Sequence, residues 1–306
     1  VTTGWGEVAW AKDNRHLLLR RSYDKAGQPG SEYILFDREQ PQLSQNLSVA
    51  FGFNPTVVEL RGLAHDQYYL YDQASGQLFT ASLKQPTPQP YLSGVLAFAS
   101  EKDTVVYATA QDAEAGTVLI RAKAKDDAPV TIRQVPAGTN YLLDMAVYED
   151  GLYLAAGAAS ENRVFLFKDP IGSLKDRPKE ALVPVQILKV EAPNFVSFSK
   201  NQRFVIAENS DKFSVYDAET DRGYVYQSKA PLDAPQTHAT WMDGFRLSYV
   251  SGGKVVVFDF DGTNLQSLSA ASPNYAPVFD RDYRFLYTLD GQNALTSTAL
   301  LTKEDL

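Results

Sequence analysis

The sequence of 306 residues contains no cysteine and only 3 histidines and 2 methionines. Without cysteine the chain forms no disulfide, thiolate metal site or cysteine nucleophile. No apolar run approaches the roughly 18 residues that a membrane-spanning helix requires. Positive charge is also scarce, because 29 Lys and Arg stand against 37 Asp and Glu, a net charge of −8. That balance argues against duplex nucleic acid or an anionic membrane surface as the main partner, since both attract basic patches.

The common hydrolase and nucleotide-binding motifs are missing as well. The sequence has no GxSxG, no HExxH and no glycine-rich phosphate loop with Lys and Ser or Thr. At 44% hydrophobic and 22% charged residues, the chain nevertheless has the composition of a folded protein with a large core. It begins at Val1 with no initiating methionine and no signal sequence, so we expect it to be part of a longer protein.

A repeated pattern runs along the whole chain. Seven short apolar or alternating runs each follow a turn-forming Asp or Asn, and these seven residues are spaced about 45 residues apart on average. Asp and Asn suit this place because their side chains hydrogen-bond the backbone across a tight turn. The seven residues are Asp13, Asp66, Asp103, Asp150, Asn201, Asp243 and Asp282.

Each repeat also predicts a strand before the turn, one after it, a third beyond a polar turn and, in most repeats, a weaker fourth. Four short strands in about 45 residues is the period of propeller blades. The sequence therefore predicts an all-β fold, a seven-bladed β-propeller of four-stranded antiparallel blades, formed by residues 1–306 as one domain. The expected blades cover about residues 4–50, 54–93, 94–137, 138–191, 192–234, 235–272 and 273–306. The most helix-like stretch, residues 169–183, is expected to be a loop or short turn.

The last repeat ends soon after its third strand. Because an open sheet edge invites aggregation, the ring should be closed by another segment. We expect residues Val1 to Thr3, or residues upstream of them, to supply the outer strand of the last blade.

Two segments resemble a known family of propellers. Residues 246–264 read RLSYVSGGKVVVFDFDGTN, and residues 201–217 follow the same order of turn, apolar strand, second turn and strand ending in Asp. They resemble blades of TolB-like propellers, which belong to the PD40 or WD40-like repeats; repeats five to seven match well and repeats one to four in outline. The chain is also similar to propeller regions of bacterial surface proteins that carry a PEGA domain, although it contains none itself. This resemblance implies an extracytoplasmic domain, anchored to the cell surface or secreted, that serves recognition or adhesion.

One motif within this segment has an enzymatic alternative. Asp259, Asp261 and Thr263 resemble the DxDxT strand end of haloacid-dehalogenase-like phosphotransferases, in which the first Asp is the nucleophile. Such an enzyme needs further downstream motifs, but only 43 residues follow Thr263. An EF-hand is also excluded, because the twelfth position from Asp259 is Ala270 rather than Glu. We interpret the motif as an Asp-Gly turn.

Candidate binding residues lie on the loops expected at one face of the propeller. The loops that lead into the innermost strands carry the aromatic residues Phe51, Phe53, Tyr141, Phe195 and Tyr275, and a second-to-third-strand loop carries Asp112 and Glu114. Aromatic and acidic side chains together suit a protein or glycan partner. The alternative for each aromatic residue is packing between blades, which we also expect for Trp5, Trp10 and Trp241.

A metal site is the enzymatic alternative. Four residues are expected on or next to innermost strands of different blades: Glu7, Glu59, Asp144 and His238. They could converge on Ca²⁺ in the axis, as in some propeller lactonases, or be solvated at the channel mouth. His16 and His65 lie beside the turns and are expected to be exposed.

Two functions therefore remain open. The first is a non-catalytic recognition propeller without a cofactor, monomeric and not itself spanning a membrane, in a larger anchored bacterial protein. The second is a metal-dependent hydrolase of lactonase type. The fold does not decide between them, because propellers serve both functions.

Overall fold

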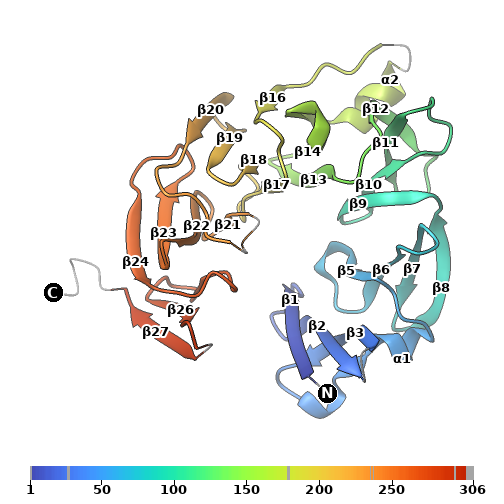
Figure 1. Cartoon of the computed structure of the whole chain (residues 1–306). Helices are drawn as coiled ribbons and strands as arrows, with labels where there is room; N and C mark the ends of the chain where they lie inside the picture. Colours follow the sequence, from blue (N-terminus) through green and yellow to red (C-terminus); the bar gives the residue numbers. More distant parts are fainter. Residues whose placement is uncertain are drawn as a thin grey trace. The chain divides into compact units, whose positions relative to one another are not determined.

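The computed structural model describes residues 2–25, 28–177, 180–234, 236, 238–292 and 294–300, with only the backbone for residues 2–8, 25, 28 and 29. It consists of seven antiparallel sheets that follow one another along the chain (Figure 1). Six sheets have four strands and the last has three. The predicted all-β seven-bladed propeller is thus confirmed. The chain divides into two compact units, Val1–Gln134 and Val135–Leu306, and each is described by itself.

The first unit contains the first three blades, and its last strand ends two residues beyond the boundary. The strands of the first blade are β1 (Thr2–Trp10), β2 (His16–Lys25), β3 (Gln28–Asp37) and β4 (Gln45–Asn46). The second has β5 (Val57–Leu60), β6 (Gln67–Asp72), β7 (Gln77–Ser82) and β8 (Gln85–Leu92), and the third has β9 (Val95–Glu101), β10 (Thr104–Thr109), β11 (Thr117–Ala124) and β12 (Val130–Pro136). A short helix, α1 (Leu47–Phe51), and the 3-10 turns Pro41–Leu43 and Arg61–Leu63 connect them.

The second unit contains the other four blades. The fourth blade has β13 (Tyr141–Tyr148), β14 (Gly151–Ala158), β15 (Arg163–Lys168) and β16 (Gln186–Lys189), and the fifth has β17 (Phe195–Phe198), β18 (Phe204–Asn209), β19 (Lys212–Asp217) and β20 (Arg222–Gln227). The sixth has β21 (Thr240–Trp241), β22 (Arg246–Ser251), β23 (Lys254–Asp259) and β24 (Gln266–Ala270), and the last has β25 (Val278–Phe279), β26 (Phe285–Leu289) and β27 (Leu295–Ala299). The 3-10 turn Ala159–Glu161 precedes β15.

A short helix replaces the expected loop after β15. α2 covers Pro170–Asp176, within the stretch expected to be a loop or short turn. Proline occupies the first helical turn, where its missing N–H costs nothing, and Pro170 and Ile171 are buried. No described helix has the length and apolar character that a membrane crossing requires.

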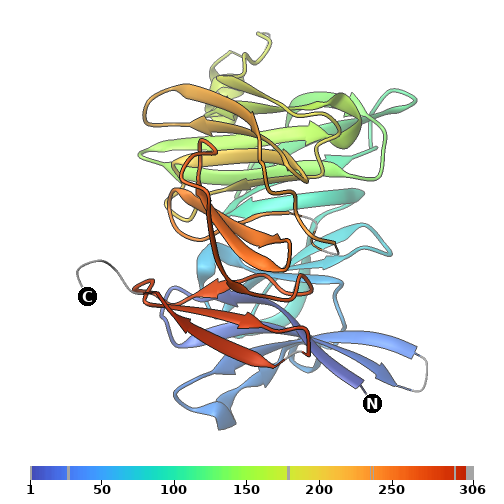
Figure 2. The same ribbon diagram turned by 60° about the vertical axis from the view of Figure 1, so that its left-hand side comes forward.

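The N-terminal residues extend the first blade. Thr2 and Thr3 pair with Asp24 and Tyr23 in β1, which lies along the long β2–β3 hairpin (Figure 2). Both strands of this hairpin have ten residues, so β2 is long enough to pair with the first residues of β1 as well. Thr2 and Thr3 therefore lie in the innermost strand of the first blade rather than in an outer strand of the last, and Val1 is outside the described residues.

The core lies between consecutive blades of each unit. In the first unit, Tyr69 and Tyr71 of the second blade pack with Val105 and Tyr107 of the third. In the second unit, Val164 of the fourth blade belongs to one cluster with residues of the fifth. Because neighbouring blades cover a middle strand on both faces, consecutive apolar residues are buried there, as at residues 204–207 of β18, which explains the short continuous runs in the sequence.

The tryptophans have different environments. Trp241 is 9% exposed and packs between the fifth and sixth blades, as expected. Trp10 is 47% exposed, with the Arg38 guanidinium 5.9 Å from its ring centroid, so the expected packing of Trp10 between blades is wrong. It is the last residue of β1, where the strand leaves the sheet. The Trp5 side chain is outside the described residues.

The predicted Asp and Asn turns are present in several blades. Asp13 Oδ1 accepts hydrogen bonds from the backbone N–H groups of Arg15 and His16, at 3.0 and 3.1 Å. Asn201 Oδ1 accepts from the N–H of Arg203 at 3.2 Å, and Asp243 Oδ1 accepts from two N–H groups in the same way. These turns define one end of each blade, the first-turn end, which also holds the turns between third and fourth strands. The opposite end, the second-turn end, holds the second-to-third-strand turns and the loops between blades.

Candidate functional site

Two candidate residues meet at the second-turn end of the second unit. Phe195 starts β17, and His238 precedes β21 of the next blade. Their rings stack with centroids 3.9 Å apart and planes inclined by 15°, and both side chains are half-buried. Burial lowers the pKa of His238, which favours the neutral ring. The structure thus joins a predicted binding residue and a predicted metal ligand into one aromatic pair.

A buried carboxyl group lies behind this pair. Glu208 of β18 is opposite Phe195 in the sheet register and is fully buried. Its Oε1 accepts a hydrogen bond from the N–H of Ala239 at 2.7 Å, while no hydrogen-bond partner for Oε2 is present in the described part of the chain. Burial raises the pKa of Glu208 well above its ordinary value, although the Ala239 N–H opposes this shift. The protonated form of Glu208 is therefore favoured.

The other candidates of the second unit lie at the same end of their blades. The Tyr141 hydroxyl accepts a hydrogen bond from the N–H of Gly138 at 3.0 Å. Asn140 Nδ2 donates to the carbonyl of Asn194 at 3.2 Å, which joins the loops before β13 and β17. Tyr275, in the loop before β25, is 48% exposed. These loops give the second unit an aromatic second-turn end.

The aromatic candidates of the first unit are packed. Phe51 is 5% exposed and meets Tyr68 edge to face at 5.3 Å between ring centroids. Phe53 meets Phe79 in the same way at 5.6 Å. Both side chains belong to or pack against the core between the first two blades, which is the packing alternative that the sequence left open for them.

The two acidic candidates lie on the β10–β11 turn. Asp112 is 78% exposed and accepts a hydrogen bond from Arg121 Nη2 at 3.1 Å. Glu114 is exposed and accepts from Gln134 Nε2 at 3.3 Å. This turn presents negative charge at the second-turn end of the third blade.

The expected calcium ligands have other partners. Glu59 accepts a hydrogen bond from Ser100 Oγ at 2.7 Å, between the second and third blades. Asp144 accepts from the N–H groups of Met145 and Phe198, both at 2.8 Å, and so connects β13 with β17. The Glu7 side chain is outside the described residues. Glu59 lies in the first unit whereas Asp144 and His238 lie in the second, so the calcium site stays a prediction.

One cluster, at the first-turn end of the first unit, was not predicted from the sequence. His16 and His65 stack with ring centroids 4.3 Å apart, and Asp13 contacts both rings. The two histidines were expected to be exposed, but the His16 side chain is only 15% exposed and that of His65 is 43% exposed. An alignment of the repeats predicts that His16 and His65 lie close together, because both flank the first turns of consecutive blades.

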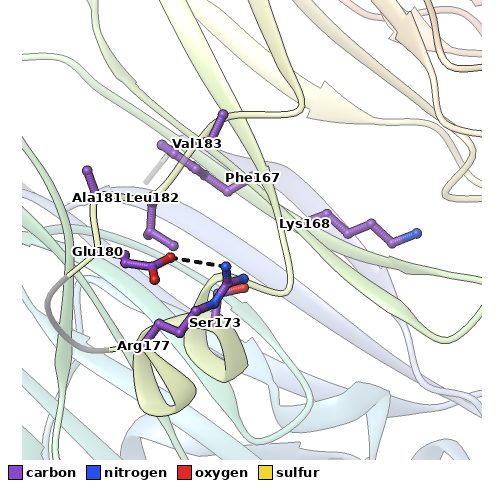
Figure 3. A pocket seen from close by; sticks show the side chains of 8 residues that line it. All are labelled: Phe167, Lys168, Ser173, Arg177, Glu180, Ala181, Leu182 and Val183. Atoms are coloured by element: carbon purple, nitrogen blue, oxygen red, sulfur yellow. Dashed lines mark hydrogen bonds and ion pairs between the residues drawn. The ribbon is translucent and has the colours of Figure 1, made fainter.

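A hollow beside α2 is a further candidate. It has a volume of about 260 Å³, and its lining includes Phe167, Ser173 and Val183 (Figure 3). Arg177 Nη1 and Glu180 Oε2 form an ion pair of 3.0 Å across it, and both side chains are largely exposed. Lys168 points away from this pair in Figure 3. The polar groups do not converge on a common point, so this hollow has no catalytic pattern.

Comparison with known proteins supports the fold. No family model and no curated protein sequence matches the chain. Among solved structures it is similar to an oligogalacturonate lyase in complex with manganese, at 11% identity over 97% of this chain and 88% of that one, with a TM-score of 0.58. It is also similar to a chain of the mitotic checkpoint complex, at 9% identity over 96% and 90% of the two chains with a TM-score of 0.55. A prolyl endopeptidase matches at 13% identity and a TM-score of 0.54 over 97% of this chain but 47% of its own.

These similarities define the class of protein. The chain is a seven-bladed β-propeller, and its structural neighbours include both binding scaffolds and enzymes. At such low identity the likeness extends to the fold alone.

Proposed function

We propose that this chain is a non-catalytic recognition propeller that binds a protein or glycan partner at the second-turn end of its blades. The observation that carries the proposal is the stacked pair of Phe195 and His238, which is half-buried at the start of two consecutive blades. A supported aromatic surface of this kind binds sugar rings and apolar side chains by stacking and apolar contact.

The groups behind the pair support it as a rigid contact surface. The hydrogen bond from the Ala239 N–H to Glu208 Oε1 fixes the backbone next to His238. The loop before Phe195 is tied to the neighbouring blade through Asn140 and Asn194. Side chains that are already ordered lose less entropy on binding, so a partner gains more from the same contacts.

The proposed setting is an anchored bacterial protein with the propeller outside the cytoplasm. The resemblance of residues 246–264 and 201–217 to TolB-like blades supports this setting, as does the similarity to propellers that accompany PEGA domains. Exposed Tyr275 and the acidic β10–β11 turn offer further aromatic and charged contacts, each within its own unit.

The test compares ligand binding by the unchanged protein and by Phe195→Ala. The probes are an array of bacterial surface glycans and a set of purified surface proteins, and each hit is quantified by surface plasmon resonance. We expect Phe195→Ala to weaken binding at least tenfold, because truncation of a central aromatic contact typically costs 2 kcal/mol or more. The matched control is Phe245→Ala, an aromatic residue that is 45% exposed at the first-turn end of the same unit. It should change binding less than twofold.

Two results would contradict the proposal. One is a ligand that binds Phe195→Ala as tightly as the unchanged protein, which would place recognition elsewhere. The other is no binding to any glycan or protein probe. Circular dichroism and thermal melting of both variants establish that each is folded.

A further inference from the structure

The cluster at the first-turn end of the first unit has the composition of a metal site. Asp13 lies in the turn between β1 and β2, His16 is the first residue of β2, and His65 lies in the corresponding turn of the second blade. Asp13 Oδ2 lies 2.7 Å from His16 Nδ1 and 3.0 Å from His65 Nδ1. One ligand atom from each of the three residues can be chosen so that all lie within 4.8 Å of one another. We propose that these three residues bind one divalent transition-metal ion, independently of the partner site above.

The spacing of these atoms suits a small ion. Bonds of about 2.0–2.1 Å in a tetrahedral site place nitrogen and oxygen ligands roughly 3.3 Å apart. The Asp13–His16 and Asp13–His65 distances, 2.7 and 3.0 Å, are about 0.6 and 0.3 Å shorter than that value, so small side-chain shifts would admit the ion. Two imidazoles and one carboxylate favour zinc and its neighbours in the first transition series over calcium or magnesium, which prefer oxygen ligands alone.

The carboxylate is oriented before any ion arrives. Asp13 Oδ1 accepts the N–H groups of Arg15 and His16, so the turn itself fixes the carboxylate and directs Oδ2 toward the two rings.

A second carboxylate lies near the other ring nitrogen of His16. Asp37 Oδ2 lies 3.7 Å from His16 Nε2, on the side of the ring away from Asp13. Asp37 is 2% exposed and is held by the Arg15 guanidinium, with Nε to Oδ1 at 2.9 Å. At 3.7 Å these two atoms are too far apart for a hydrogen bond, so Asp37 contributes negative charge beside the ring.

The cluster opens into a cavity of about 570 Å³, whose lining includes Asp13, His16, Asp37, Glu39 and His65. Three protein ligands leave room for water or a small molecule at the fourth position of a tetrahedral ion. Acidic groups outnumber Arg15 around this cavity, which attracts cations.

The test measures binding of Zn²⁺ to the EDTA-treated full chain by isothermal titration calorimetry and of Co²⁺ by visible absorption. We expect one ion per chain and Co²⁺ bands typical of mixed nitrogen and oxygen ligands. His65→Phe retains a ring for stacking but removes a ligand, and Asp13→Asn retains the turn acceptor, as Asn201 does in the fifth blade. Each should weaken Zn²⁺ binding at least tenfold.

The control is Asp243→Asn, which makes the same exchange as Asp13→Asn in the first turn of the sixth blade and should leave the Zn²⁺ affinity within twofold. The proposal is overturned if the unchanged protein binds no stoichiometric Zn²⁺. It is equally overturned if either His65→Phe or Asp13→Asn, shown by circular dichroism to be folded, binds Zn²⁺ as the unchanged protein does. Two independent variants keep the test decisive even if one of them misfolds.

Discussion

Buried carboxyl groups of this protein have two kinds of surroundings. Asp217 is 1% exposed and accepts hydrogen bonds from Arg203 Nε and Nη2 at 2.7 and 2.6 Å. Burial opposes ionisation of Asp217, but Arg203 and nearby donors outweigh it and lower its pKa. Burial raises the pKa of Glu208 instead, because no cation balances it within the described residues. Whether a buried carboxyl group of this protein is ionised therefore depends on its charged and hydrogen-bonding partners and not on burial alone.

The raised pKa of Glu208 predicts a pH-dependent stability. In the unfolded chain Glu ionises near pH 4.3, whereas folded Glu208 retains its proton to higher pH. Stability from this group is fully present below the unfolded pKa and is lost as pH rises toward the folded pKa, by at most about 1.4 kcal/mol per pH unit. Glu208→Gln keeps the acceptor for the Ala239 N–H and removes the titration. The free energy of unfolding of Glu208→Gln, relative to that of the unchanged protein, should therefore increase from pH 5 to pH 8.

Urea denaturation across this pH range measures the difference. Glu180→Gln, at a side chain that is 64% exposed, is the control and should follow the unchanged protein at every pH. A constant difference between Glu208→Gln and the unchanged protein would mean that Glu208 has an ordinary pKa in the folded state.

At the scale of elements, the repeat determined most of what could be predicted. The strands and turns were predictable because an Asp or Asn turn before a short apolar run is a local signal that recurs in every blade. α2 was missed because its seven residues include a proline and a glycine, and its helical form depends on the burial of Pro170 and Ile171. Tertiary packing of this kind leaves little trace in a short segment.

The candidate site was only partly predictable. Phe195 and His238 were each singled out, but their stacking requires two blades to meet and so cannot be read from either segment. Glu208 gave no signal, since a Glu in a strand is normally exposed. His16 and His65 are 49 residues apart in sequence, and only the repeat places them in adjacent turns.

At Gly157 the strands β14 and β15 lie too close together for a side chain on β14. A Cβ at this position would lie 2.9 Å from the carbonyl oxygen of Arg163 and 3.2 Å from the Cα of Val164, both backbone atoms of β15. Because backbone cannot move aside as a side chain does, Gly157→Ala should separate the two strands and cost about 1–3 kcal/mol. The free energy of unfolding in urea measures this cost.

Gly138→Ala is the matched control, because apart from its chain neighbours no described residue has an atom within 4 Å of the Cβ it would add. It should change stability by less than about 0.5 kcal/mol. Equal stability of the two variants would show that β14 and β15 are not as close at Gly157 as the structure has them.

At the scale of the whole molecule, net charge and an open strand edge act against each other. Within the described residues β27 pairs only with β26, and Leu295 on β27 is 71% exposed. An unpaired edge with exposed apolar side chains favours pairing between chains. The net charge of −8 opposes such pairing through repulsion, which salt weakens.

We therefore expect the isolated chain to be monomeric at low ionic strength and to associate as salt is added. Leu295→Lys should suppress this association, because a charge on an edge strand is costly to bury between chains. Light scattering over a salt series measures the change. Val49→Lys, on α1 at a side chain that is 77% exposed, should associate as the unchanged protein does. A molecular mass that does not change with salt would exclude association of chains through β27.

The Asp and Asn turns have a consequence for how this fold can change over time. Asn201 holds its turn with the same side-chain oxygen that Asp13 uses, so the turn accepts either residue and its geometry is indifferent to charge. A mutation between Asp and Asn can thus add or remove a negative charge at the end of one blade while the blade keeps its shape. Asp13, Asn201 and Asp243 hold their turns in this way, so ligand chemistry can be gained or lost there one turn at a time, without a new fold.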